Sequence, residues 1–204
     1  MTDVSESATV RLPQGEISLE EWAALPEDEP GELVDGRLED EEVPDAIHEL
    51  VVGWLMQVLR NWLSGMGGVV LGSEAKFALR ARRGRKPDLS LFLPGGAKPP
   101  RRGVIRVPPD IAIEISSPAP RDVRRDRIEK MDDYAGFGVR WYWIVDPELR
   151  SVEIYELGQD GRYMRTLGAV GRVEFVPGCA GLTLDLPALW QEIDQLAPED
   201  TSVE

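Results

Sequence analysis

The order of three predicted elements in the second half of the chain limits its fold more than any other feature. Residues 110–116 alternate apolar and polar side chains, residues 121–136 repeat apolar side chains at helical spacing, and residues 140–145 are mostly apolar and aromatic. A strand, a helix and a second strand of one sheet form a crossover unit with parallel strands. Residues 88–93 are a further strand, expected to pair antiparallel with residues 110–116. The predicted fold class is therefore α/β, with a central mixed sheet flanked by helices.

The first half of the chain is predicted to contribute two helices and a hairpin. A capping-box pattern predicts a short helix over about residues 19–25, and an Asp-Gly pair predicts a tight hairpin within residues 32–38. Nine apolar side chains between residues 47 and 63 form one helical stripe, with Asp45 as N-cap and Gly65 as the stop. The remaining predicted elements are a strand at 69–79 interrupted at Gly72, a hairpin of 151–157 and 162–167, and short strands with a last helix over about 172–195.

The length of 204 residues predicts one domain, assigned to residues 17–195, between disordered tails at residues 1–16 and 196–204. No apolar run approaches the roughly 18–20 residues that cross a bilayer, and the N-terminus lacks the basic and apolar segments of a secretory signal. The single cysteine, Cys179, excludes an internal disulfide and a zinc–cysteine site, and the single histidine, His48, excludes a histidine-rich metal site. A cytoplasmic protein without a membrane partner is expected.

Charge is distributed unevenly along the chain. The net charge of −14 disfavours phosphate binding, but residues 76–130 contain 15 basic and 6 acidic side chains and so carry +9. A solvated loop in an arginine-rich protein explains this segment as well as a phosphate-facing surface does. The charge pattern alone therefore leaves both interpretations open.

Two carboxylates on neighbouring predicted strands are the first candidates for chemistry. Glu114 lies in the middle of strand 110–116, although a central strand of an α/β sheet is normally apolar on both faces. Asp88 begins the strand before it. Two carboxylates held close together repel unless a cation lies between them, and ligation by oxygen atoms, with the carbonyl of Ile115 completing the set, suits Mg²⁺ or Mn²⁺. The alternative for Glu114 is a buried glutamate paired with an arginine.

Lys130 is the third candidate. On the helical wheel of residues 121–136 it falls at the edge of the apolar arc, so it faces inward or extends outward along the helix. Arg127 falls inside the same arc, so this test does not single out the lysine. His48 lies on the apolar side of the long helix, where a core histidine is favoured over a ligand.

Several motifs occur in the order found in a known family. They are Glu32-Leu33-Val34-Asp35-Gly36, His48, Pro87-Asp88, Ile113-Glu114-Ile115-Ser116-Ser117-Pro118, Asp126…Lys130…Tyr134, Gly138-Val139 and Trp141-Tyr142-Trp143-Ile144-Val145-Asp146-Pro147. As a set, over roughly residues 16–165, they resemble the Uma-two family of restriction-endonuclease-like proteins in the PD-(D/E)xK nuclease superfamily. None of the motifs is specific by itself.

The resemblance implies a restriction-endonuclease-like core of a helix, three antiparallel strands, a second helix and a parallel strand. The N-terminal hairpin and the C-terminal strands are additions to this core. The resemblance also implies that Asp88 and Glu114 are metal ligands. The superfamily places a lysine two residues after the glutamate, where this chain has Ser116, and Lys130 matches the helix lysine that substitutes for it in the family. Two further recurrent positions of the family's cleft are matched by His48 and Glu32.

These residues together predict a metal-dependent endonuclease that hydrolyses phosphodiester bonds of nucleic acid, DNA favoured, with Mg²⁺ or Mn²⁺ as cofactor. The basic side chains expected to hold the phosphate backbone are Arg82, Arg83, Arg85, Lys86, Arg101, Arg102 and Arg124. The missing strand lysine and the acidic net charge favour an alternative, a nuclease-fold module that binds or regulates with weak or no catalysis. A metal-dependent phosphoesterase acting on nucleotides is a further alternative, and a homodimer is left open.

Overall fold

The computed structural model describes residues 15–26, 31–39 and 44–197, and every structural statement below refers to these residues. The predicted tails, 1–16 and 196–204, lie almost wholly outside the described residues, so their disorder stays a prediction. The predicted single domain likewise stays a prediction.

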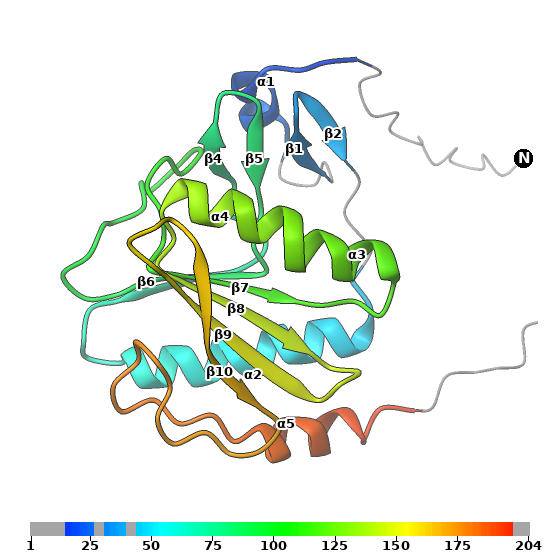
Figure 1. Cartoon of the computed structure of the whole chain (residues 1–204), viewed down its shortest axis with the longest axis vertical. Helices are drawn as coiled ribbons and strands as arrows, with labels where there is room; N and C mark the ends of the chain where they lie inside the picture. Colours follow the sequence, from blue (N-terminus) through cyan, green and yellow to red (C-terminus); the bar gives the residue numbers. More distant parts are fainter. Residues whose placement is uncertain (1–14, 27–30, 40–43, 198–204) are drawn as a thin grey trace, which may run out of the picture.

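A large mixed sheet forms the centre of the described part of the chain (Figure 1). Its strands lie in the order β10-β9-β8-β7-β6-β3. The neighbours β7 and β8 are parallel and all other pairs are antiparallel, which confirms the predicted mixed sheet. The strands are β3 (Val69–Leu71), β6 (Leu89–Phe92), β7 (Ile111–Ile115), β8 (Trp141–Asp146), β9 (Ser151–Leu157) and β10 (Tyr163–Ala169).

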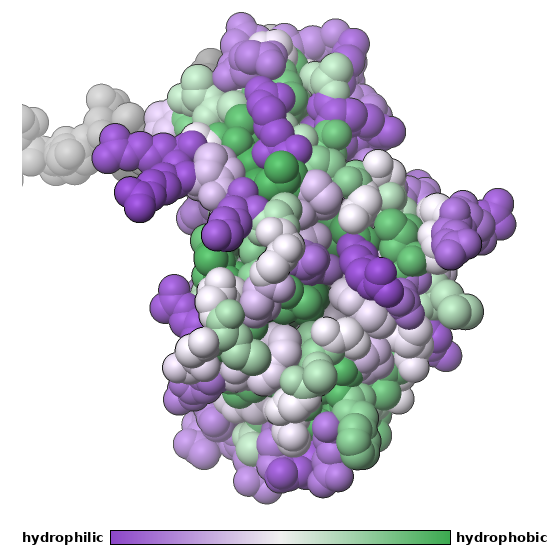
Figure 2. All heavy atoms as spheres, turned by 90° about the vertical axis from the view of Figure 1, so that its left-hand side faces the viewer, coloured by the Kyte–Doolittle hydropathy of each residue, from purple (hydrophilic) through white to green (hydrophobic). Residues whose placement is uncertain are grey.

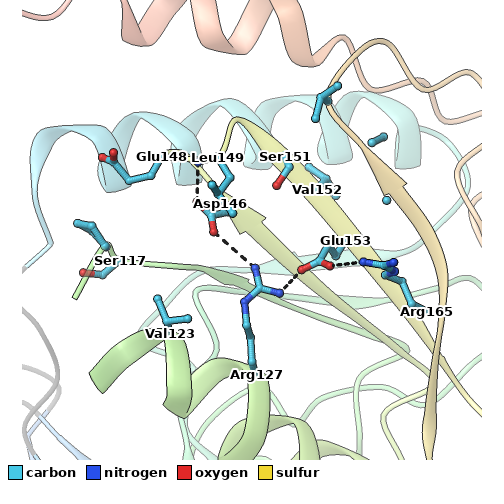
Figure 3. A pocket seen from close by; sticks show the side chains of 14 residues that line it. Ser117, Val123, Arg127, Asp146, Glu148, Leu149, Ser151, Val152, Glu153 and Arg165 are labelled. Carbon is cyan, nitrogen blue, oxygen red and sulfur yellow. Dashed lines mark hydrogen bonds and ion pairs between the residues drawn. The ribbon is translucent and has the colours of Figure 1, made fainter. Parts of the chain in front are cut away.

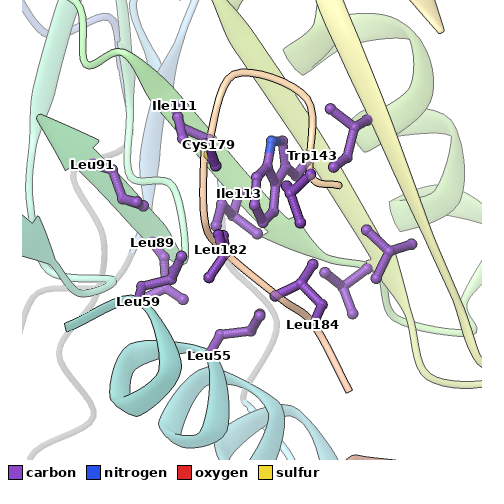
Figure 4. Close-up of a cluster of buried hydrophobic side chains, with 14 of the residues drawn as sticks. Leu55, Leu59, Leu89, Leu91, Ile111, Ile113, Trp143, Cys179, Leu182 and Leu184 are labelled. Carbon is purple, nitrogen blue, oxygen red and sulfur yellow. The ribbon is translucent and has the colours of Figure 1, made fainter. Parts of the chain in front are cut away.

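Helices cover both faces of this sheet, as Figure 1 shows. On one face lie α2 (Ala46–Leu63), capped by Asp45 as predicted, and α5 (Leu186–Ile193). Their apolar side chains pack with those of the central strands into the main core (Figure 4). In that core Leu55 and Leu59 of α2 are fully buried, as are Ile113 and Trp143 of the sheet, so the apolar stripe predicted from the sequence is the buried face of α2.

The opposite face of the sheet is covered by one helical segment in three parts: α3 (Pro120–Arg124), the π-helix η1 (Arg125–Lys130) and α4 (Met131–Phe137). The sequence predicted a single helix over 121–136. The spacing of apolar residues cannot distinguish an α-turn from the wider π-turn. π-turns are rare in proteins, and those that occur are often found at functional sites. The segment ends at Gly138, whose left-handed backbone (φ 91°) closes the helix.

A second, smaller sheet has the order β2-β1-β5-β4. Its strands β1 (Glu32–Val34) and β2 (Arg37–Glu39) form the predicted hairpin, and β4 (Phe77–Arg80) pairs with β5 (Arg83–Arg85). The strand predicted over 69–79 is thus two strands in two sheets. The prediction missed β5, because its sequence Arg-Gly-Arg lacks the β-branched and aromatic residues that mark strands.

Trp22 of α1 (Leu19–Ala24) packs on the small sheet directly above Gly84 of β5. A Cβ atom at position 84 would lie 2.3 Å from the Trp22 ring. Gly84→Ala is therefore expected to destabilise the protein by about 1–3 kcal/mol, because a buried indole has to move. Urea unfolding measures this, with Gly136→Ala as the control.

Gly136 lies in α4, where an added Cβ atom meets nothing within 4 Å. Gly136→Ala is expected to be neutral or to stabilise by up to about 1 kcal/mol, because alanine favours the helix. Equal unfolding midpoints for Gly84→Ala and the wild type would contradict the close packing of Trp22.

Candidate active site

The two predicted carboxylates meet at one edge of the large sheet. Glu114 is the fourth residue of β7, and Asp88 immediately precedes β6. Because β6 and β7 are antiparallel, with Leu89 opposite Ile113, the start of β6 lies beside the end of β7. The backbone N–H of Ile115 donates a hydrogen bond to Asp88 Oδ2 (2.7 Å). This catalytic edge, defined by Asp88, Glu114 and Ile115, gathers all three predicted metal ligands.

Lys130 points into the protein at this edge. Its Nζ donates to Glu114 Oε2 (2.6 Å) and lies 3.7 Å from Asp126 Oδ1 and 3.9 Å from Glu32 Oε1. The hydroxyl of Tyr134 donates to the other Glu114 oxygen, Oε1 (2.5 Å). All five side chains are buried. Lys130 therefore reaches the carboxylate of Glu114 from the helix. The alternative interpretation of Glu114 predicted a buried pair with an arginine, whereas the observed partner is this lysine.

The π-helix sets this geometry. Asp126 and Lys130 both lie in η1, four residues apart, and both are buried against the catalytic edge, while Arg127 points to the other side. Tyr134 follows in α4. Its hydroxyl donates a hydrogen bond to Glu114, so Tyr134 is not merely a residue of the apolar core. The sequence motif Asp126…Lys130…Tyr134 contains both residues, but neither was predicted to belong to the site. The signal for both is their spacing of four residues on either side of Lys130.

Burial raises the pKa of Glu114 well above its usual range, against the influence of Lys130 and with that of the carboxylates of Asp88 and Asp126. Burial also raises the pKa of Asp126. Burial by itself would lower the pKa of Lys130, but Glu114 and then Glu32 outweigh it and raise that pKa above its usual value. Lys130 is therefore an ammonium at neutral pH.

Glu32 connects the small sheet to the site. It accepts hydrogen bonds from the backbone N–H of Lys86 (2.9 Å) and from Arg85 Nη1 (2.6 Å). Arg85 is fully buried and also donates to Asp133 Oδ2 of α4 from Nε (2.9 Å) and Nη2 (2.7 Å). Although burial opposes it, the charges of Lys130 and Arg85 lower the pKa of Glu32. Arg85 thus holds Glu32 and the helix that carries Lys130 in one arrangement.

His48 lies at the site rather than in the core. Its Nε2 is 3.1 Å from Asp88 Oδ1, and both side chains are partly exposed. Burial lowers the pKa of His48, but the hydrogen bond and charge of Asp88 outweigh this and raise it. The interpretation of His48 as a core histidine is therefore corrected. The first turn of α2, which carries His48, lies at the catalytic edge beside Asp88.

The oxygen donors at this edge are of the kind that a divalent cation prefers. The side chains of Glu32, Glu114 and Asp126 lie around the ammonium of Lys130, and Asp88 lies at the start of the neighbouring strand. The buried hydroxyl of Ser116 accepts or donates no hydrogen bond among the described residues. Within the described ranges, no three His, Cys, Asp or Glu side chains form a ready-made metal cluster. Both oxygens of Glu114 accept hydrogen bonds from the protein itself.

The basic residues predicted to hold phosphate are placed differently from the expectation. Arg83, Arg85 and Lys86 are buried and paired with carboxylates, so their prediction as direct phosphate contacts is corrected. A count of charges along the chain cannot reveal ion pairs with distant residues. Arg82 is exposed but pairs with Glu16 (2.8 Å).

The other three predicted phosphate contacts are also exposed. Arg124 ends α3, the helix that follows β7, and so lies near the catalytic edge, 3.8 Å from Glu129. Arg101 and Arg102 lie in the loop that joins β6 to β7 at the opposite edge of the sheet. The structure therefore does not bring these two arginines to Asp88 and Glu114.

A pocket of about 870 Å³ lies on the other flank of η1 (Figure 3). In it Arg127 bridges Glu153 and Asp146, and Arg165 donates to the same Glu153 (2.8 Å). These ion pairs compensate the cationic groups of the pocket. They also show why Arg127, which the helical wheel placed in the same arc as Lys130, is partly buried without reaching the catalytic edge.

Comparison with known proteins agrees with this geometry. Residues 18–187 match the profile of the family Uma2, described as "Putative restriction endonuclease". The fold is similar to that of a crystal structure titled as a putative nuclease belonging to DUF820 from Anabaena variabilis ATCC 29413, with a TM-score of 0.65 and 21% identity. That similarity covers 86% of this chain and 98% of the other. No curated protein matches the sequence. No described helix is long and apolar enough to cross a membrane.

Proposed function

Because the chain belongs to the Uma2 family of restriction-endonuclease-like proteins, we propose that it is a divalent-metal-dependent endonuclease that hydrolyses phosphodiester bonds of nucleic acid, DNA favoured. The observation that carries the proposal is the buried contact of Lys130 with Glu114, beside Asp88, at one edge of the sheet. An acidic oxygen cluster with one fixed ammonium suits phosphoryl chemistry, which needs a cation site and a compensating charge.

In this proposal Asp88, Glu114 and the carbonyl of Ile115 hold Mg²⁺ or Mn²⁺. The bound cation supplies a water of lowered pKa and neutralises phosphate charge. Lys130 cannot act as a base while its pKa is raised, so it stabilises the negative charge that develops on the phosphate. Tyr134 fixes the orientation of Glu114, and His48 fixes that of Asp88.

A second candidate function is a module that binds nucleic acid with weak or no catalysis. Ser116 at the usual lysine position and the net charge of −14 favour it. The two candidates differ in one measurable property, since only the endonuclease needs a metal held by Asp88 and Glu114.

Plasmid and single-stranded DNA are expected to be cut in the presence of Mn²⁺ or Mg²⁺, and EDTA is expected to stop the reaction. Asp88→Ala is expected to lower the cleavage rate by more than roughly 10–100-fold, which is the typical loss when a residue that hydrogen-bonds a metal ligand is removed. Gel assays measure the initial rates, and calorimetric titration with Mn²⁺ measures whether the variant still binds the metal.

The matched control is Asp194→Ala, which removes an exposed carboxylate of a surface ion pair with Arg150. Its rate should equal that of the wild type. Full activity of Asp88→Ala would contradict the metal role, and DNA binding by a wild type that never cuts would favour the second candidate.

A further inference from the structure

Three segments that are distant in sequence meet at the edge of the large sheet opposite the catalytic edge. They are the loop 93–110 between β6 and β7, residues 138–140 before β8, and the turn 158–162 between β9 and β10. Hydrogen bonds at the ends of the adjoining strands hold them together. The first residue of β8 bonds to the loop (Trp141 N to Asp110 O, 3.0 Å), and the first residue of β10 bonds to the second segment (Tyr163 OH to Val139 O, 2.6 Å). In Figure 1 this edge lies on the left, whereas β7 points to the right.

These segments collect positive charge in a protein that is acidic as a whole. They contain six basic and two acidic residues, against a net charge of −14 for the chain. We define the basic edge by five exposed residues: Lys98, Arg101, Arg102, Arg140 and Arg162. Figure 2 faces this side of the molecule, and hydrophilic side chains project from it at several heights.

The cations of the basic edge are largely uncompensated. Arg140 pairs with Glu156 (2.8 Å), but Lys98, Arg101, Arg102 and Arg162 form no ion pair with a described residue. The loop holds two of them next to Pro99-Pro100, whose fixed backbone dihedrals limit the freedom lost on binding. Exposed arginines bind phosphate well because their planar groups donate two parallel hydrogen bonds.

The catalytic edge has the opposite character. It consists of carboxylates, with Asp88 hydrogen-bonded to the end of β7 and Glu114 buried beside it, and such oxygen-rich surfaces suit a cation rather than the phosphates of a bare nucleic acid. Arg124 is exposed near this edge but lies 3.8 Å from Glu129. Affinity for a nucleic acid therefore has to draw on another surface as well, and counterion release by unpaired cations is the main source of such affinity.

We propose that the basic edge binds the sugar–phosphate backbone of nucleic acid, separately from the catalytic edge, so that the substrate is a polynucleotide reaching across the sheet. This inference rests on the proposed nuclease function for its choice of partner. The two edges are at least the length of β7 apart, about 17 Å for its five residues at ~3.3 Å each. At ~3.4 Å per nucleotide, the substrate spans about five nucleotides or more.

The test compares two triple variants that remove the same charge. The first, Lys98→Gln/Arg101→Gln/Arg102→Gln, neutralises the loop of the basic edge. The control, Arg60→Gln/Arg150→Gln/Arg172→Gln, neutralises exposed arginines of α2, of the turn after β8 and of the segment before α5. Fluorescence anisotropy with a labelled 30-nucleotide single strand in EDTA measures binding without cleavage.

The loop variant is expected to bind about tenfold or more weakly at ~100 mM salt, and its slope of log K against log salt should fall by about 2, since each lost contact contributes ~0.7. The control should bind within twofold of the wild type. Arg140→Gln/Arg162→Gln should also weaken binding, which tests whether the three segments act as one surface.

Three results would overturn the inference: unchanged binding by the loop variant, an equal loss in the control, or a wild type that binds poly-glutamate in preference to the oligonucleotide. Failure of the nuclease proposal looks different. In that case the wild type binds the oligonucleotide through the basic edge but never cuts it. If instead the wild type cuts and the loop variant binds as tightly as the wild type, the nuclease proposal stands and the basic-edge proposal fails.

Discussion

Lys130→Met is expected to lower the rate of phosphodiester cleavage by roughly 100–1000-fold, the range found when a group that stabilises transition-state charge is removed. Methionine keeps most of the length and volume of the side chain but not the charge that contacts Glu114 at 2.6 Å. Single-turnover kinetics at saturating Mn²⁺ measure the effect on the chemical step. Circular dichroism at the same temperature confirms that the variant is folded, because loss of a buried partner also reduces stability.

Arg127→Met is the matched control for this prediction. Arg127 lies in the same π-helix and is ion-paired, but its partners, Glu153 and Asp146, line the pocket on the other flank. Its cleavage rate is expected to stay within a few-fold of the wild type. Equal losses in the two variants would show that the helix, not the ammonium of Lys130, limits the rate.

Arg85→Met is expected to destabilise the protein by about 3–5 kcal/mol, the cost of breaking a buried ion pair by removing one partner. Arg85 is wholly buried and is the shared partner of Glu32 and Asp133, so its loss leaves two buried carboxylates with less compensation. Urea unfolding at pH 7 measures the change. Arg150→Met, which breaks an exposed pair with Asp194, should cost less than about 1 kcal/mol.

The deficit of Arg85→Met should also depend on pH. The pKa of Glu32 in the folded protein lies below its ordinary value of 4.5, so its ionic contacts stabilise the protein above that pH. This contribution is lost as the pH falls through the folded pKa, because Glu32 then becomes protonated. The difference between variant and wild type is therefore expected to shrink in acid, and a deficit that grows on acidification would contradict the role assigned to Glu32.

Most of the architecture could be predicted because its signals are local. The capping box of α1, the stripe of α2 and the strand–helix–strand order of β7, α3–α4 and β8 depend on residues close in sequence. The sequence also predicted Asp88, Glu114 and Lys130 as site residues. Glu114 was predicted because a charged residue in an otherwise apolar strand requires an explanation, whereas Lys130 could be separated from Arg127 only through the resemblance to the Uma-two family.

What could not be predicted depends on long-range pairing. Arg85 and Glu32 are 53 residues apart, and only the fold reveals that the arginine is interior. The same is true of His48, whose partner Asp88 is brought to it by the start of β6. A basic stretch of sequence can therefore contain both buried, ion-paired residues and exposed cations. Only the burial of each side chain in the folded protein distinguishes the two.

The π-turn of η1 has a consequence for insertions and deletions. A π-turn closes over one residue more than an α-turn, and each residue of an α-helix advances the direction of the side chains by about 100°. Removing one exposed residue within Arg125–Lys130, such as Ile128, would let the segment close as a regular α-helix while the parts before and after it keep nearly their present orientation. Asp126 and Tyr134 would then be seven residues apart, about two full turns, and would still share a face. A deletion between Lys130 and Tyr134 would instead turn Tyr134 by about 100° away from Glu114, because α4 has no extra residue to give up. The helix is thus expected to tolerate a lost residue in its π-turn better than in the α-turn that follows.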